Sequence, residues 1–243
     1  MKHLVIGLGE VGSAVRNVLN CDSYDTIQPE PKLDHRYDMI HICFPWSDEF
    51  VNYVIEYQAT FKADYVVVHS TVPLGTCDAE NWIHSPVRGV HPNLEEGIRT
   101  FVKYFGGKAA WVPAEEFKKL GIDVHYTATA KTTEALKLWD TTQYGILITL
   151  QKEIYAYCKR NQVDFSQVYT HANQTYNEGY TKLGKPEVVR PFLDQQDGPI
   201  GGHCVIPNAN ILRVQEIGVI MKMLNSMLEV NAFLESQENA QGE

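Results

Sequence analysis

The stretch HLVIGLGEVGSAV, residues 3–15, decides the fold of this chain. It joins an apolar run typical of a buried strand to a helical pattern through a turn that contains Gly7, Gly9 and Gly12. Gly7 allows a tight turn, Gly9 lets a pyrophosphate approach the backbone, and Gly12 lets the helix pack closely on the strand. The N–H groups at the start of that helix can then bind the anion. The stretch therefore predicts a dinucleotide-binding turn.

Further candidates for holding the dinucleotide lie in and after this turn. Glu10 and Val11 belong to the motif itself. An acid after the second strand is expected to bind the ribose hydroxyls, and Glu30 stands at the best spacing from Gly12. Asp25 is the alternative if the second strand is shorter. Because no arginine directly replaces the acid, the sequence favours NAD over NADP.

The rest of the first half alternates short apolar runs with helical patterns. This order predicts the α/β fold class, as a Rossmann-type doubly wound parallel sheet with helices on both faces. We expect a helix at residues 114–121, and further strands at residues 24–28, 38–44, 64–70, 109–113 and 123–127.

The second half is helical in its pattern. Residues 129–162 contain a single glycine and no proline, which predicts one long, mostly buried helix. Two further helices are expected, at residues 164–183 and 210–236. We therefore expect an NAD-binding Rossmann domain of residues 1–128, followed by an all-helical domain of residues 129–243.

Composition narrows the class of protein. The net charge of −9 disfavours binding to nucleic acid or to an anionic membrane surface. No apolar run is long enough to span a bilayer, and the first residues lack the pattern of a signal peptide. The five cysteines form no CxxC pair and no metal-ligand spacing with histidine, so no metal site is expected. We expect a cytoplasmic protein with reduced thiols.

A second unusual stretch, DGPIGGHCVIPN at residues 197–208, places a cysteine in a glycine-rich turn. Cysteines in the core usually lie in apolar strands or helices, where the thiol acts as a small hydrophobic group. A thiol in a glycine-rich turn is easier for a substrate to reach. Cys204 is therefore a candidate nucleophile, with a buried structural thiol as the alternative.

Five motifs carry a resemblance to a known family when they are taken in order: GLGEVG, ICFP, HSTVPLGT, TEALKL and GPIGGHCVIP. Together they resemble the UDP-glucose/GDP-mannose dehydrogenase family, from residue 1 to about residue 235. The resemblance implies a Rossmann NAD domain joined by a long helix to a helical domain that pairs two chains as a homodimer. It also implies a small-molecule substrate, a nucleotide sugar whose primary alcohol is oxidised to a carboxylate while two NAD are reduced.

The resemblance further implies roles for individual residues. Cys204 matches the family's nucleophile, which adds to the aldehyde and makes a second hydride transfer feasible. Lys137 matches the lysine on the long helix that holds or deprotonates the alcohol, with a solvated helix lysine as the alternative. Glu96 matches a later glutamate of the family. The matched cofactor-side residues are Phe44, Pro45, Ser70 and Thr71, and the matched substrate-side residues are Gly201, Gly202 and His203.

Three positions depart from the family's pattern. Asn208 stands where the family has an aspartate that helps to activate water, Thr141 where it has asparagine, and Asn93 where it has an acid. The length of the chain leads us to expect a short form without the family's third domain, which completes the nucleotide-sugar site. Three hypotheses follow. The one that we favour is a short dehydrogenase acting on a smaller or differently held alcohol. The others are a dehydrogenase that needs a separate chain for the missing domain, and a non-catalytic NAD-binding protein.

The stretch GVHPN at residues 89–93 resembles a different enzyme, prephenate dehydrogenase, in which a histidine assists the oxidation. His91 is therefore a candidate acid or base, and with Asn93 it is assigned to the substrate side. Short β-hydroxyacid dehydrogenases also place a catalytic lysine on the long helix after the Rossmann domain. Neither comparison explains the cysteine turn, so both are secondary.

Overall fold

The computed structural model describes residues 1–27, 33–89, 91–200, 204–215 and 218–241. Its contacts divide the chain into two compact units, Met1–Lys137 and Leu138–Glu243. The division falls inside the long helix α6 (Ala130–Asn161), whereas the sequence placed the boundary just before that helix. The start of α6 packs with the first unit because Ala130 belongs to one of its hydrophobic clusters.

The first unit is built on a sheet of seven strands among the described residues, in the order β2-β1-β3-β4-β5-β6-β7. Every neighbouring pair is parallel except β5 and β6. The strand order reverses direction at β1, which has β2 on one side and β3 on the other, as in a doubly wound sheet. The strands are β1 His3–Ile6, β2 Asp22–Tyr24, β3 Met39–Ile42, β4 Tyr65–Val68, β5 Ile83–His84, β6 Lys103–Gly106 and β7 Val124–Thr127.

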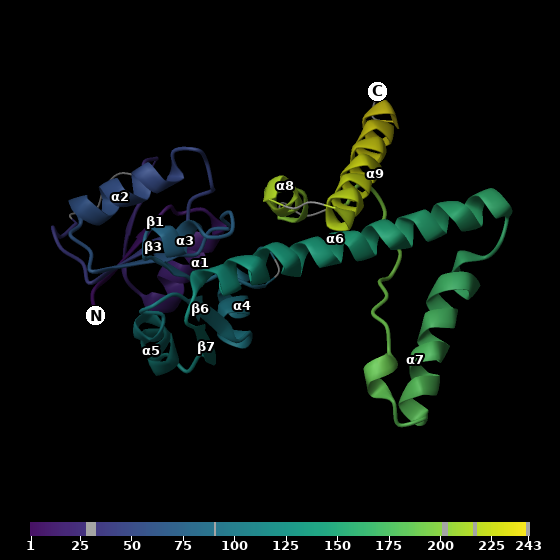
Figure 1. Cartoon of the computed structure of the whole chain (residues 1–243), viewed down its shortest axis with the longest axis horizontal. Coiled ribbons are helices and arrows are strands. Elements are labelled where there is room, and N and C mark those ends of the chain that lie inside the picture. Colours follow the sequence, from purple (N-terminus) through teal and green to yellow (C-terminus); the bar gives the residue numbers. More distant parts are fainter. Residues whose placement is uncertain (28–32, 90, 201–203, 216–217, 242–243) are drawn as a thin grey trace. The chain divides into compact units, whose positions relative to one another are not determined.

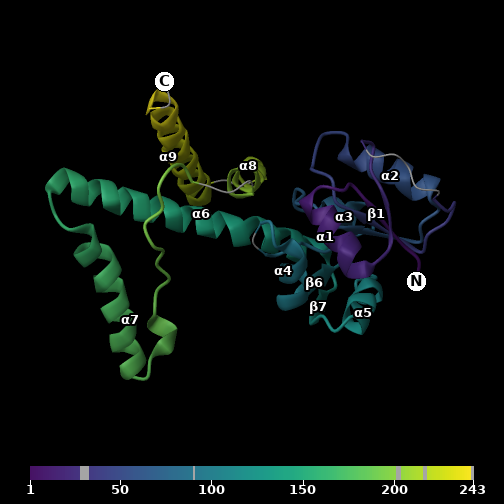
Figure 2. The same ribbon diagram turned by 180° about the vertical axis from the view of Figure 1, so that it is seen from behind.

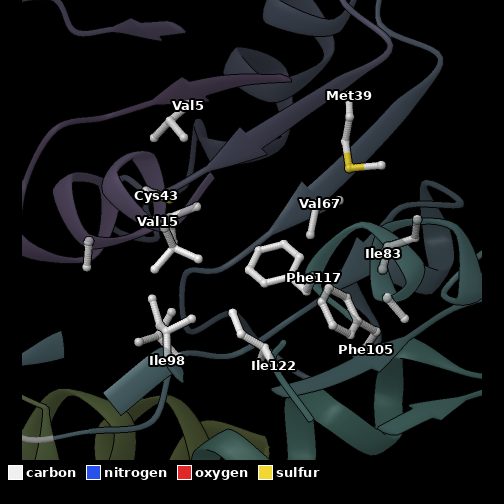
Figure 3. Packing of buried hydrophobic residues seen from close by; sticks show 14 of the residues in the cluster. Val5, Val15, Met39, Cys43, Val67, Ile83, Ile98, Phe105, Phe117 and Ile122 are labelled. Atoms are coloured by element: carbon white, nitrogen blue, oxygen red, sulfur yellow. The ribbon is translucent and has the colours of Figure 1, made fainter. Parts of the chain in front are cut away.

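Helices cover both faces of this sheet (Figure 1). Alternate residues of a strand point to opposite faces, so Val5 packs on one side while Leu4 and Ile6 pack on the other. The Val5 face is covered by α1 (Glu10–Leu19), α4 (Leu94–Thr100) and α5 (Trp111–Lys119), and Figure 3 shows part of its core. The opposite face is covered by α2 (Phe50–Thr60) and α3 (Thr76–Ala79). The Rossmann-type prediction is thus confirmed.

Three details of the sequence prediction differ from the structure. The strand expected at residues 109–113 is wrong, because that segment leads into and begins α5. Pro113 lies in the first turn of α5, where a backbone N–H has no helical partner to lose. The strand expected at residues 24–28 is shorter and earlier, and β2 ends at Tyr24. The single helix expected at residues 210–236 is two helices, with Gly218 at a φ of 75° between them.

Helices are the only regular secondary structure among the described residues of the second unit. It contains most of α6, a π-helical turn at Ser166–His171, α7 (Ala172–Lys182), a short 3-10 turn at Pro186–Val188, α8 (Val205–Gln215) and α9 (Val219–Gln241). Figure 2 shows α6 as one unbroken helix, as its sequence pattern predicted. The prediction that this helix is mostly buried is wrong, because most of its residues are half-buried or exposed. A glycine within α6 allows close packing, since a Cβ at Gly145 would lie 2.5 Å from Val205 Cγ1 and 2.8 Å from Met227 Sδ.

In the described part of the chain, none of the helices has the length and apolar character required to cross a bilayer. The same residues contain no cluster of three or more histidine, cysteine or acidic side chains able to hold a metal ion.

Gly145→Ala tests the packing of the helical unit. Alanine is the better helix former by about 1 kcal/mol, but its methyl group would overlap Val205 and Met227, and overpacking costs about 1–3 kcal/mol. We expect the melting temperature measured by circular dichroism to fall by about 2–4 °C. The matched control is Gly179→Ala in α7, where a Cβ would meet nothing within 4 Å and the substitution should raise stability. An equal gain for both variants would contradict the packing described here.

Candidate functional site

The turn after β1 requires glycine at its first position. Gly7 has a φ of 90°, in the region that L side chains rarely adopt. A Cβ there would lie 3.0 Å from the Phe44 backbone N and 3.1 Å from the Cys43 backbone C, at the end of β3. The first turn and the end of the neighbouring strand are therefore in direct backbone contact.

The third glycine of the motif lets α1 rest on this turn. A Cβ at Gly12 would lie only 1.7 Å from the carbonyl oxygen of Gly7, so no side chain fits. Gly9 caps α1, and no side-chain hydrogen bond caps this helix among the described residues. A Cβ at Gly9 would meet no described residue within 4 Å, so this side of the α1 N-terminus is uncovered in the described part of the chain. Such an N-terminus favours an anion through its N–H groups and the helix dipole.

A cavity of about 380 Å³ lies beside this turn, at the carboxyl ends of β1, β2 and β3. Its walls are largely aromatic, with one carboxylate, and include Gly7 of the turn itself. Tyr24 and Tyr57 meet edge to face with ring centroids 5.7 Å apart. Flat aromatic walls next to an anion-binding turn suit a purine nucleotide. The lining residues are Ile6, Gly7, Tyr24, Asp25, Thr26, Phe44, Tyr53 and Tyr57.

Asp25 is the acid that the structure places at this cavity. It follows β2 directly, and its carboxylate accepts hydrogen bonds from Leu8 N at 2.6 Å and from Ile27 N at 2.9 Å. The Leu8 bond ties the carboxylate to the glycine turn and fixes its position at the cavity wall. Glu30, which the sequence favoured for the ribose, lies outside the described residues.

The remaining cofactor-side candidates lie at the ends of β3 and β4. Phe44 lines the cavity, while Pro45 is exposed. Ser70, half-buried after β4, donates its hydroxyl hydrogen bond to Phe44 O at 2.5 Å and so ties the two strand ends together. Thr71 is half-buried beside it. Val11 is half-buried in the first turn of α1.

Two candidates from distant parts of the sequence meet at the start of α1. Glu10 Oε2 and His91 Nδ1 form a close ion pair when the imidazole is protonated. Glu10 is favourably placed in the first helical turn, although its charge opposes an incoming anion. The protonated form of His91 offsets that charge. Asn93 and Glu96 line a neighbouring hollow of about 450 Å³ together with Pro92, Glu95 and Arg99.

Lys137 is half-buried on α6 and donates a hydrogen bond from Nζ to Val87 O at 2.9 Å. This contact distinguishes it from a solvated helix lysine. One turn earlier on α6, Thr133 shares a hydrogen bond of 3.0 Å with the buried His84 of β5. Burial lowers the pKa of His84 to about 3. The amine of Lys137 is therefore held at a defined place against the loop after β5.

In the helical unit, two of the three positions that differ from the pattern of the resembled family contact each other. Asn208 Nδ2 donates a hydrogen bond to Thr141 Oγ1 at 2.8 Å, and Asn208 is 4% exposed. Cys204 is half-buried just before α8, and its carbonyl accepts the Asn208 N–H at 3.1 Å. The pair is therefore a neutral, satisfied contact one helical turn from the thiol. Gly201, Gly202 and His203 lie outside the described residues.

Sequence reasoning did not find Tyr53 and Tyr57 of the cavity. Their spacing of four places them on one face of α2, so the pattern itself carried a signal. Only the fold shows that this face turns towards the end of β2, where Tyr57 meets Tyr24.

Comparison with known proteins gives the fold but no sequence family. No protein-family model and no curated protein sequence matches this chain. The fold is similar to that of UDP-D-ManNAc dehydrogenase from Pyrococcus horikoshii, with a TM-score of 0.76 and 17% identity over 99% of this chain and 72% of that chain. It is also similar to a UDP-glucose dehydrogenase from Pyrobaculum islandicum, with a TM-score of 0.69 and 19% identity over 96% of this chain and 68% of that chain.

A shorter type of enzyme is similar over nearly its whole length. The 3-hydroxyisobutyrate dehydrogenase of Mycobacterium tuberculosis gives a TM-score of 0.68 and 11% identity over 96% of this chain and 94% of that chain. These likenesses define the class of the fold, a Rossmann-type sheet followed by a helical unit on a long helix. The fold alone does not specify an activity, so the activity has to be argued from the residues of this chain.

Gly12→Ala and Gly9→Ala separate the two uses of glycine in the turn. Because the new methyl group would overlap Gly7 O, Gly12→Ala should lower the free energy of unfolding by about 3 kcal/mol, measured by urea denaturation. Gly9→Ala should change it by less than about 0.5 kcal/mol, since nothing lies within 4 Å of the added carbon. Equal losses in the two variants would show that α1 does not rest on Gly7 as described.

Proposed function

We propose that this chain is an NAD-dependent dehydrogenase that oxidises an alcohol by hydride transfer. The observation that carries the proposal is the aromatic cavity beside the glycine turn, with the Asp25 carboxylate fixed in its wall. The open N-terminus of α1 supports a pyrophosphate site at the same turn. The similarity of the fold to solved dehydrogenases also supports a dinucleotide site at this turn.

The residues fit a nicotinamide dinucleotide in three parts. The tyrosines of the cavity provide flat surfaces for the adenine, Asp25 can accept hydrogen bonds from the ribose hydroxyls, and the first N–H groups of α1 face the pyrophosphate. When bound, the nicotinamide supplies the hydride acceptor. Ser70 and Thr71 are assigned to its side of the site.

The carboxylate of Asp25 favours NAD over NADP. A phosphate on the ribose 2′-oxygen would place negative charge against this carboxylate, which is already held by Leu8 N–H.

Asp25→Asn tests this assignment, because the amide keeps an oxygen for Leu8 N–H and loses the charge, together with the oxygen that accepts from Ile27 N–H. We expect the dissociation constant for NADH to rise about tenfold, and that for NADPH to fall, because the repulsion is gone. Fluorescence titration of both reduced cofactors measures the two constants. Asp123→Asn, at an exposed position before β7, is the charge control and should change neither. Unchanged preference in Asp25→Asn would refute the role of this carboxylate.

Lys137 is the residue that we assign to the alcohol. A half-buried amine held by Val87 O can accept the hydroxyl proton, or stabilise the developing alkoxide, as the hydride leaves. The oxidation of the alcohol then yields an aldehyde, one reduced cofactor and one proton.

Cys204 is assigned to a second oxidation. Its thiolate adds to the aldehyde carbon and the oxygen takes up a proton, which gives a thiohemiacetal with a hydrogen to lose as hydride to a second NAD⁺. Water then hydrolyses the resulting thioester to the carboxylate and the free thiol. The neutral Asn208–Thr141 pair supplies no carboxylate to take a proton from that water. Hydrolysis is therefore the slow step of this route, unless Glu96 provides the base.

The yield of NADH per substrate tests the role of Cys204. A panel of nucleotide sugars should include one from which the chain forms two NADH per molecule oxidised. In Cys204→Ala the yield should fall to one, with accumulation of the aldehyde, because no thiohemiacetal forms. Cys21→Ala, at another half-buried thiol, is the control and should keep a yield of two. A yield of two in Cys204→Ala would remove the thiol from the mechanism.

A second candidate function is oxidation of a small hydroxyacid. It is favoured by the match to 3-hydroxyisobutyrate dehydrogenase over 94% of that chain and by the neutral Asn208–Thr141 pair. Lys137 keeps its role in this reaction, whereas Cys204 has none. One NADH per hydroxyacid, with full activity in Cys204→Ala, would establish this function in place of the first. The homodimer and the separate chain that supplies a further domain stay predictions.

A further inference from the structure

Three histidines cross the buried face of the sheet in a diagonal row. His3 begins β1, His41 lies in β3, and His69 follows β4. The register pairs His3 with Met39, two residues before His41, and pairs His41 with Val67, two residues before His69. A step of two along each strand keeps all three side chains on the same face. This is the face covered by α5, and Phe117 of that helix packs against two of the rings.

The three imidazoles form a continuous chain of contacts. His3 Nδ1 lies 3.0 Å from His41 Nε2, and His41 Nδ1 lies 2.9 Å from His69 Nε2. Successive rings are stacked with centroids 5.2 Å apart. His41 is 0% and His69 2% exposed, so these nitrogens interact within the protein interior. We call the three residues the histidine row.

The outer end of the histidine row meets a surface carboxylate. His3 Nε2 lies 3.5 Å from Glu116 Oε2, and Glu116 also contacts the Met1 amino group at 3.4 Å and Lys119 Nζ at 2.5 Å. The Lys119 hydrogen bond is the largest cause of a lowered pKa for Glu116, so this carboxyl is ionised near neutral pH. The row therefore ends on a group that exchanges protons with solvent.

The inner end meets a buried lysine. Lys103 Nζ lies 3.3 Å from His69 Nδ1 and donates hydrogen bonds to Ser85 O at 2.7 Å and Pro86 O at 2.9 Å. His69 Nδ1 also lies 2.7 Å from Ser85 O. Lys103 is 3% exposed, and its amine lies over the rings of Phe105 and Phe117. A buried ammonium has no direct exchange with water.

The geometry permits two alternative sets of hydrogen bonds along the histidine row. With Lys103 as an ammonium, it donates to His69 Nδ1, each histidine carries its proton on Nε2, and His3 donates to the Glu116 carboxylate. With Lys103 as a neutral amine, each histidine carries its proton on Nδ1, and His69 donates to the amine or to Ser85 O. The two sets differ by one proton, and each leaves one close contact without a proton. In the first set this is the 2.7 Å contact of His69 Nδ1 with Ser85 O, and in the second it is the contact of His3 Nε2 with the Glu116 carboxylate.

We propose that the histidine row is a proton relay that exchanges one proton between the buried amine of Lys103 and the surface carboxylate of Glu116. The ammonium of Lys103 gives a proton to His69 Nδ1, and His69 gives its Nε2 proton to His41 Nδ1. His41 then gives its Nε2 proton to His3 Nδ1, and His3 gives its Nε2 proton to Glu116. One N–H bond breaks and one forms at each ring, so every histidine starts and ends neutral. Glu116 then releases the proton to solvent, and the reverse order recharges Lys103.

The charges around the histidine row favour neutral imidazoles that change tautomer over protonated imidazolium rings. Burial lowers the pKa of His41 and His69 well below the usual value, with His3 and Lys103 adding repulsion, and His84 also faces His69. The pKa of His3 is lowered by burial, against raising effects of Glu116 and Asp38.

The lysine at the inner end has the same preference for a neutral state. Burial lowers the pKa of Lys103 well below its usual value, and Lys137 lowers it further, whereas Cys43 opposes the shift. The ammonium form is therefore present below this lowered pKa and is lost as the pH rises through it. Loss of its proton reverses the tautomers of the whole row.

The relay has a consequence for the proposed oxidation, and this part alone rests on the proposed function. Lys103 holds the carbonyls of Ser85 and Pro86, and Lys137 holds the next carbonyl, that of Val87. A charge on Lys103 therefore disfavours a charge on Lys137, so that at a given pH a larger fraction of Lys137 is the neutral amine that can accept the hydroxyl proton.

Nitrogen-15 NMR of the histidine side chains in the full chain tests the relay without cofactor or substrate. As the pH rises from about 6 to about 10, we expect His41 and His69 to change from the Nε2–H to the Nδ1–H tautomer at one shared midpoint, which is also the midpoint of the Lys103 amine. Tautomers that stay fixed over this range, separate midpoints, or imidazolium signals from His41 and His69 would each overturn the relay.

Glu116→Gln shows whether the outer end belongs to the relay. The amide removes the charge that favours the Nε2–H set and adds an N–H that can donate to His3 Nε2, so the shared midpoint should fall by about one pH unit. Glu115→Gln, on the same helix and paired only with Lys118 among the contacts seen, is the matched control and should leave the midpoint unchanged. An equal shift in both variants would refute the assignment of Glu116. If the shared midpoint is found but the chain has no dehydrogenase activity, the relay is supported and only the proposed function is refuted.

Discussion

The close approach of α1 to the turn after β1 is the constraint on which the functional part of this protein depends. Gly12 has no room for even a methyl group because Gly7 O would lie 1.7 Å from its Cβ. Gly7 in turn touches the backbone at the end of β3. These contacts hold a helix N-terminus, two strand ends and the carboxylate of Asp25 in one fixed arrangement, since Asp25 is bonded to Leu8 in the same turn. The anion site and the aromatic cavity are consequences of that arrangement.

The sheet carries the ligand cavity and the buried histidine row at two different places. Its carboxyl ends carry the cavity and the loop held by Lys137, where a bound ligand is reachable from solvent. Its α5-covered face buries the histidine row and Lys103, where polar groups persist because each has a hydrogen-bond partner. The loop after β5 links them, because its successive carbonyls accept hydrogen bonds from Lys103 on one hand and Lys137 on the other.

The sequence predicted those features that depend on local patterns. Glycine spacing and apolar periodicity determine the first turn, the doubly wound sheet and the long helix, and all three are present. Features that depend on where an element ends were less predictable: β2 stops at Tyr24, which brings Asp25 to the cavity, and the segment before Pro113 starts a helix. Contacts between distant residues left no signal in one sequence. The Thr141–Asn208 pair and the histidine row both belong to this class, because only the fold and strand register bring their members together.

The central claim is that the glycine turn and the adjoining cavity bind a nicotinamide dinucleotide. Titration of the isotope-labelled chain with NAD⁺, followed by backbone amide chemical shifts, tests it most directly. The account predicts the largest saturable changes at Gly9, Glu10 and Val11 and at the cavity residues Asp25 and Tyr57. Changes confined to other parts of the chain, or no saturable change at millimolar cofactor, would contradict it.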